Sequence, residues 1–314
     1  MPTLKQAADF IFKKLFEAKK HEKVLVVADS TSMKLARIFH NSAKKISKPE
    51  ILKIPVGKID GEEPPKYAAD AMKKADVILL IAEKSLSHTK ARKAATAKGA
   101  RIASMPGITA SMLKRAVVLD YKKMYRTKNK LMNILKKAKK CRVTTKKGTD
   151  ITFKIPKIKY GRKKHGLKYK GNWNNLPAGE AYFAPTDANG IYVIDASVID
   201  RKVDKPIKIV VKGRHAKKIE GGRSAARLRN TLKKLRDKNS YNIAELGIGI
   251  NPKARITGNI LEDEKVLGTC HIALGSSFAI GGKIKAKCHL DGVIKNPTII
   301  VGKKTIMKQG KLKI

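Results

Sequence analysis

The sequence contains few cysteines and few aromatic residues. Its 314 residues include three cysteines, none of them in a C-x-x-C pair, and 5% aromatic side chains. An odd number of dispersed cysteines does not suit a disulfide scaffold and fits a reducing compartment, so we expect a cytoplasmic protein. The low aromatic content disfavours a base-stacking platform for single-stranded nucleic acid.

Long hydrophobic runs and glycine-rich phosphate loops are also missing. No apolar run reaches the roughly 18 residues of a membrane span, and lysine and aspartate interrupt the apolar N-terminal residues, unlike a signal peptide. We therefore expect no membrane association. The turn after the first expected strand reads A-D-S-T-S-M and contains no glycine, so it forms neither a G-x-G-x-x-G nor a Walker motif.

Acidic residues are scarce over the whole chain. There are 25 aspartates and glutamates against 71 lysines and arginines, which gives a net charge of +46. Such a surface predicts non-specific affinity for polyanions. Lysine outnumbers arginine, although arginine is better suited to recognising bases by hydrogen bonds. The charge therefore also fits a basic surface that is simply solvated. A non-catalytic protein that binds RNA or another polyanion is kept as one alternative.

The charge is unevenly distributed. Residues 121–170 hold 20 lysines and arginines and a single acid, Asp150. Residues 171–200 hold no lysine or arginine, and their four acids are Glu180, Asp187, Asp195 and Asp200. A cation-free window in so basic a chain indicates buried strands or a site that stays electronegative.

The N-terminal part alternates strand-like and helical patterns. This alternation predicts an α/β domain with a parallel, doubly wound sheet over residues 1–140, ending in a basic connecting helix at 120–140. Helical spacing of apolar residues predicts the helices, and short apolar runs predict the strands. The expected helices are 1–20, 33–47, 64–75, 89–98 and 109–117, and the expected strands are 23–29, 51–56, 76–82 and 101–105.

The pattern changes after residue 140. A hairpin signal, K-K-G, separates the strand-like runs 141–145 and 149–155. Only 224–238 reads as a helix. We expect a mainly β (α+β) metal-binding domain over residues 141–314. Its further expected strands are 190–194, 206–211, 243–250, 269–274, 292–294 and 298–301.

Three segments of this second domain carry side chains that bind metals. N-L-P-A-G-E-A-Y-F-A-P contains Glu180, A-E-L-G-I-G-I-N-P contains Glu245, and C-H-I-A-L-G with H-L-D contains His271, His289 and Asp291. A carboxylate in an apolar strand such as Glu245 is costly unless it is paired or binds a metal. His-x-Asp on a strand places both side chains on one face. The segments together predict a divalent-metal site.

The same segments resemble the hallmark motifs of the aminopeptidase T (thermophilic leucyl aminopeptidase) family of metallopeptidases, over most of residues 175–301. The resemblance implies a two-domain cytosolic enzyme, usually a homodimer, with a dinuclear centre of Zn, Co, Mg or Mn. By resemblance, the residues above are the metal ligands, and Glu264 is a nearby carboxylate that would act as general base. It implies a metal-dependent aminopeptidase that hydrolyses a peptide substrate with a metal-activated water.

One residue departs from that family and supports an alternative. The peptidases carry a tyrosine seven residues after the position of His271, where this chain has Phe278. The superfamily is also similar to mononuclear non-haem iron enzymes that open the ring of 2,5-dihydroxypyridine. In that alternative His271, His289 and Asp291 form a two-histidine, one-carboxylate iron triad for a small-molecule substrate, and Glu180 or Glu245 supports the ligands or carries protons.

Overall fold

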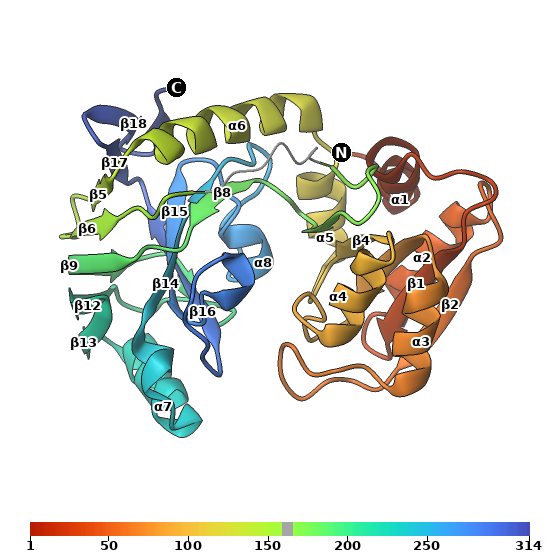
Figure 1. Ribbon diagram of the computed structural model, residues 1–314, viewed down its shortest axis with the longest axis horizontal. Coiled ribbons are helices and arrows are strands. Elements are labelled where there is room, and N and C mark those ends of the chain that lie inside the picture. Colours follow the sequence, from red (N-terminus) through yellow and green to blue (C-terminus); the bar gives the residue numbers. More distant parts are fainter. Residues whose placement is uncertain (159–165) are drawn as a thin grey trace. The chain divides into compact units, whose positions relative to one another are not determined.

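The computed structural model of the protein describes residues 1–158 and 166–314 (Figure 1). The chain forms two compact units. Unit 1 comprises Met1–Leu119 and Arg162–Ala178, and unit 2 comprises Asp120–Gly161 and Gly179–Ile314. The expected boundary at residue 140 places helix α6 (Tyr121–Lys137) in the first domain. In the structure α6 instead groups with unit 2, because it contacts strand β8 (Glu180–Phe183) of that unit.

Unit 1 is built on a parallel five-stranded sheet in the order β2-β1-β3-β4-β7. Its strands are β1 (Val24–Asp29), β2 (Glu50–Ile54), β3 (Val77–Ile81), β4 (Arg101–Ser104) and β7 (Trp173–Asn175). Every residue of β1, β3 and β4 is buried, which suits a parallel sheet covered on both faces. The sequence W-N-N of β7 has no strand-like alternation, and for that reason this edge strand was not predicted.

Helices cover the sheet of unit 1. They are α1 (Leu4–Phe10), α2 (Met33–Ala43), α3 (Lys66–Lys74), α4 (Lys90–Ala97) and α5 (Ala110–Met112), with π-helical turns at Ile11–Phe16 and Leu113–Val117. Ala68 and Met72 of α3 and Ala91 of α4 pack in one buried cluster with Leu25 and Ile78 of the sheet. Thr89 begins α4 by accepting a hydrogen bond from the Arg92 backbone N–H.

Unit 2 contains two antiparallel sheets. One has the order β11-β10-β16-β15-β14-β8 and the other β13-β12-β9-β6-β5-β17-β18-β19. Phe153 on β6 packs edge-on against Phe183 on β8, with 6.4 Å between ring centroids, so buried faces of the two sheets meet. The strands are β5 (Lys140–Thr144), β6 (Asp150–Lys154), β8, β9 (Asp187–Ile194), β10 (Ser197–Val198), β11 (Arg201–Lys202), β12 (Ile207–Lys212), β13 (His215–Glu220), β14 (Ile243–Gly249), β15 (Thr269–Gly275), β16 (His289–Lys295), β17 (Thr298–Val301), β18 (Lys304–Lys308) and β19 (Lys311–Leu312).

The helices of unit 2 include the expected α7 (Arg223–Leu235) and a shorter one that was not predicted. The short helix α8 (Ile260–Asp263) begins at Asn259, whose side chain accepts from the Leu261 backbone N–H, and it contacts β16. Its four residues are too few to show a helical period, so the sequence pattern does not reveal it. 3-10 turns lie at Lys238–Tyr241 and Phe278–Ile280.

Both parts of the predicted fold class are confirmed: an α/β unit with a parallel sheet, and a mainly antiparallel β unit. Within the described residues, no helix is both long enough and apolar enough to cross a bilayer.

Candidate metal centre

The candidate ligands come from four neighbouring strands of the six-stranded sheet. In the antiparallel register Glu245 on β14 lies opposite Ala273 on β15, which lies opposite Asp291 on β16. His271 and His289 are each two residues from members of that row, and side chains two residues apart share a face of a strand. The register alone therefore gathers these side chains on one face of the sheet.

Small residues occupy the positions between the ligands on that face. Gly247 lies opposite His271, and Gly249 lies opposite Glu180 at the start of β8. A Cβ atom added at Gly247 would lie 2.0 Å from Nε2 of His271. One added at Gly249 would lie 2.1 Å from the carbonyl oxygen of Val266. Glycine is required because the imidazole and the 265–266 backbone lie directly over β14.

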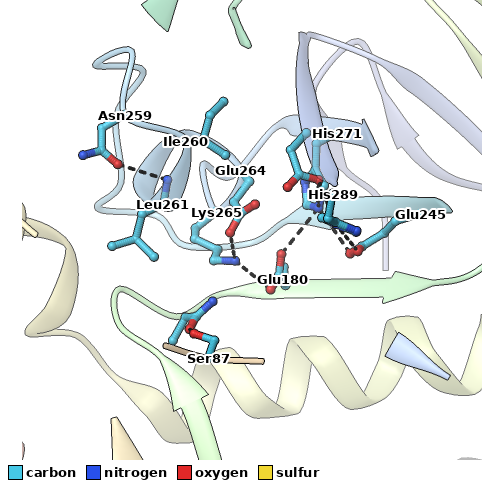
Figure 2. A network of polar contacts seen from close by, with 12 residues as sticks. Ser87, Glu180, Glu245, Asn259, Ile260, Leu261, Glu264, Lys265, His271 and His289 are labelled. Carbon is cyan, nitrogen blue, oxygen red and sulfur yellow. Dashed lines mark hydrogen bonds and ion pairs between the residues drawn. The ribbon is translucent and has the colours of Figure 1, made fainter. Parts of the chain in front are cut away.

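The polar atoms of the site converge within the distances expected around a metal ion (Figure 2). Nε2 of His271 is 3.4 Å from Oε1 of Glu245, 3.5 Å from Oε2 of Glu180 and 4.0 Å from Oδ1 of Asp291. Nε2 of His289 is 3.3 Å from Oε2 of Glu245 and 3.6 Å from Oδ1 of Asp291. Ligand atoms that each lie about 2.1 Å from one ion are separated by roughly 3–4.2 Å.

Two further observations fit a metal ion. Nδ1 of His289 lies 2.8 Å from the backbone oxygen of Ser276, and if this nitrogen carries the proton, the Nε2 lone pair faces the carboxylates. Oδ1 of Asp291 is buried and accepts no hydrogen bond from any described residue. A buried carboxylate oxygen in that state is costly unless a cation binds it. We conclude that the residues present fit a divalent metal.

The structure brings together all the candidate site residues. Three overlapping groups have ligand atoms within 4.8 Å of one another: Glu180, Glu245 and His271; Glu245, His289 and Asp291; and Glu264, His271 and Asp291. Of the E-D-E run, only Glu264 belongs to these groups. Glu262 and Asp263 instead accept backbone hydrogen bonds, from Arg255 at 3.0 Å and from Thr257 at 2.7 Å.

Sequence reasoning missed a cation inside the site. Lys265 is 1% exposed, and its ammonium contacts Oε1 of Glu180 at 2.7 Å and pairs with the carboxylate of Glu264 (Figure 2). A second lysine, Lys128 on α6, places Nζ 5.4 Å from the ring centroid of Tyr182. The sequence signal for Lys265 is a lysine directly after three acids within a glycine-rich, apolar stretch. Lysine is so frequent in this chain that the signal is not distinctive.

The carboxylates and imidazoles change one another's proton affinities. Burial opposes the charged form of His271, but the hydrogen bond to Glu245 and the charge of Asp291 raise its pKa to about 9. The pKa of His289 is likewise raised against the effect of burial, chiefly by Asp291. Burial would raise the pKa of Glu245, but the two histidines lower it to about 2. A metal that binds here must displace protons from the imidazoles.

The pKa values of Glu264 and Lys265 are shifted for other reasons than those of the histidines and Glu245. Burial raises the pKa of Glu264 to about 8, although the charge of Lys265 opposes this rise. Burial also disfavours the charged ammonium of Lys265, but Glu180 and Glu264 more than compensate and raise its pKa above the ordinary value. Lys265 therefore stays charged within the site.

Comparisons of the sequence with known proteins identify related dioxygenases. The family model described as NicX, 2,5-dihydroxypyridine 5,6-dioxygenase, matches residues 15–314. A curated 2,5-dihydroxypyridine 5,6-dioxygenase from Pseudomonas putida is 27% identical over 194 residues, which cover 56% of this chain and 55% of that protein. The match thus spans only about half the length of this curated relative.

Two solved structures share the fold over nearly the whole chain. The structure of 2,5-dihydroxypyridine dioxygenase from Pseudomonas putida aligns with a TM-score of 0.83 at 20% identity, and it covers 99% of this chain and 96% of its own. Wild-type AmpT from Thermus thermophilus aligns with a TM-score of 0.70 at 13% identity, over 99% of both chains. The resemblance to aminopeptidase T is therefore confirmed for the fold alone.

The prediction of a metallo-aminopeptidase was wrong. The family model and the curated relative both name a dioxygenase, which contradicts the expected peptide hydrolase. The role given to Glu264, a general base for peptide hydrolysis, falls with that activity. The error arose because the motifs follow the strands of a fold that this chain shares with both solved structures.

Proposed function

The chain belongs to the NicX family, 2,5-dihydroxypyridine 5,6-dioxygenase, and from this premise we propose that it is a ring-cleaving dioxygenase with a mononuclear non-haem iron centre. The proposed substrate is a dihydroxylated pyridine. The observation that carries the proposal is the convergence of His271, His289 and Asp291 on one face of β15 and β16, within a family match that includes all three.

The triad is suited to ferrous iron. Two imidazoles and one carboxylate, with positions left open for other ligands, are the donor set of many iron(II) oxygenases. Nε2 of His289 and Oδ1 of Asp291 are 3.6 Å apart, and Nε2 of His271 is 4.0 Å from the same oxygen. When bound there, iron would supply the redox chemistry that activates dioxygen.

The remaining residues position the triad. Glu245 places one oxygen 3.4 Å from Nε2 of His271 and the other 3.3 Å from Nε2 of His289, so it fixes both rings. The contact between Nδ1 of His289 and the Ser276 carbonyl holds that ring from the other side.

Homodimer formation, a cytoplasmic location and weak polyanion binding remain predictions.

The test is oxygen uptake by protein loaded anaerobically with ferrous iron and mixed with 2,5-dihydroxypyridine. We expect oxygen consumption together with loss of the pyridine absorbance, and loss of both in His289→Ala and Asp291→Ala. His215→Ala, on β13, is the matched control and should retain activity. No oxygen uptake by the iron-loaded protein, with metal-dependent release of amino acids from peptide amides, would overturn the proposal.

A further inference from the structure

The buried lysine of the site is held in place by its backbone. The Lys265 N–H donates to the carbonyl of Glu262 at 2.9 Å, and its own carbonyl accepts from the Asn251 N–H at 2.8 Å. Gly249 lets this backbone lie directly over β14, since a Cβ there would lie 2.9 Å from the Lys265 carbonyl carbon. These contacts fix the position of the Lys265 backbone, from which the side chain extends into the site.

The ammonium of Lys265 joins two carboxylates that belong to different ligand groups. Glu180 groups with Glu245 and His271, while Glu264 groups with His271 and Asp291. Lys265 contacts both Glu180 and Glu264. The third group, made of Glu245, His289 and Asp291, contains neither of the carboxylates that the lysine contacts.

A lysine at this point competes with a metal for the same oxygens. Nζ is 2.7 Å from Oε1 of Glu180. An ion bound to that oxygen at about 2.1 Å would lie within about 5 Å of the ammonium. Repulsion between two cations at that separation is weakly screened in a buried site. Side-chain oxygens that could complete a second metal position are thus already paired with the protein's own cation.

We propose that Lys265 is a built-in cation that takes the place of a second metal ion and limits the centre to one divalent ion per chain. The inference rests on the proposed metal centre but not on the reaction that the centre performs. In this arrangement Glu180 and Glu264 hold the lysine, and His271, His289 and Asp291 hold the metal.

The experiment counts metal ions in the full-length protein. Metal-free protein is titrated with Mn²⁺ and followed by calorimetry, by elemental analysis after desalting, and by electron paramagnetic resonance, which distinguishes isolated ions from a spin-coupled pair. We expect one isolated ion in the wild type and two coupled ions in Lys265→Met, whose side chain has similar length and no charge.

Lys128→Met is the matched control, because it removes a nearby positive charge without touching the Glu180–Glu264 pair. It should still bind one ion. The proposal is overturned if the wild type binds two ions, if folded Lys265→Met still binds one, or if Lys128→Met also gains a second ion. The wild-type titration keeps the test decisive should Lys265→Met fail to fold.

The two proposals fail in different ways. The ion count needs no substrate and no iron, so a wild-type protein with one ion and no oxygen uptake overturns the dioxygenase alone. Oxygen uptake by a centre that binds two ions overturns the role of Lys265 and the single-ion centre, but leaves the ring-cleaving reaction standing. A wild type that binds neither Mn²⁺ nor ferrous iron overturns both.

Discussion

Replacing Gly247 by alanine should dislodge one metal ligand without otherwise changing the site. The added Cβ would lie 2.0 Å from Nε2 and 2.1 Å from Cε1 of His271, where ordinary contact begins near 3.4 Å. The ring must therefore withdraw by about 1.4 Å, several times the roughly 0.2 Å by which metal–ligand distances vary. We expect His271 to stop binding the metal in Gly247→Ala.

The expected magnitude follows from the loss of that ligand. Changing a residue that only supports a ligand weakens metal binding by about 10–100-fold, so displacing the ligand itself should cost at least about 100-fold, or about 2.7 kcal/mol. Crowding of the buried sheet should also lower the free energy of unfolding by about 1–3 kcal/mol. Calorimetric titration of metal-free protein with Mn²⁺ measures the first effect, and chemical denaturation in chelator measures the second.

Gly292→Ala is the matched control for crowding. Its added Cβ would meet Cδ1 of Ile194 at 2.3 Å, a terminal methyl group on the side of β16 that faces away from Asp291. This variant should lose stability but keep its metal affinity. Wild-type metal affinity in folded Gly247→Ala would refute the placement of the His271 ring over β14.

Two further predictions concern pH and the parallel sheet. Because the pKa of His271 is raised to about 9 and that of His289 is also raised, metal affinity should increase from about pH 6.5 to pH 9 and then level off. Titrations in buffers of different ionisation enthalpy should show proton release, and a pH-independent affinity would contradict the charged imidazoles. In unit 1, fully buried Asp29 accepts the Glu83 N–H at 2.6 Å and the Ser32 N–H at 3.1 Å. Asp29→Asn should lower the unfolding free energy by about 1–3 kcal/mol at pH 7. Although burial opposes it, hydrogen bonding lowers the pKa of Asp29, so its contribution is present above about pH 4 and is lost as the pH falls through the folded-state value. Equal acid sensitivity of the variant and the wild type would contradict this.

The sequence pointed to the segments that meet on the candidate metal-binding face because their signal was local. His-x-Asp at 289–291 fixes a common face through strand alternation, and the acid in the apolar run at Glu245 indicates a compensating cation. The register of three strands then brings these segments together. The α/β pattern of unit 1 was equally readable, since β1 and β3 are continuous apolar runs followed by helix starts.

What the sequence did not reveal depends on contacts between distant segments. Gly247 is needed only because His271 lies opposite it, and this pairing is a property of the folded sheet. Lys265 enters the site because the 265–266 backbone crosses β14, which no periodicity records. Phe278, at the one departure from the peptidase pattern, is 51% exposed with Nζ of Lys285 4.7 Å from its ring centroid. That departure was the sequence signal for the dioxygenase alternative.

The proposed ring-cleaving dioxygenase reaction places both atoms of dioxygen in the opened ring of the substrate. Mass spectrometry of the product formed under ¹⁸O₂ by iron-loaded protein tests it most directly. We expect a ring-opened product that carries two labelled oxygen atoms from one molecule of dioxygen, and no such product from Asp291→Ala. A product whose new oxygen comes only from solvent water would show hydrolysis and contradict the proposed function.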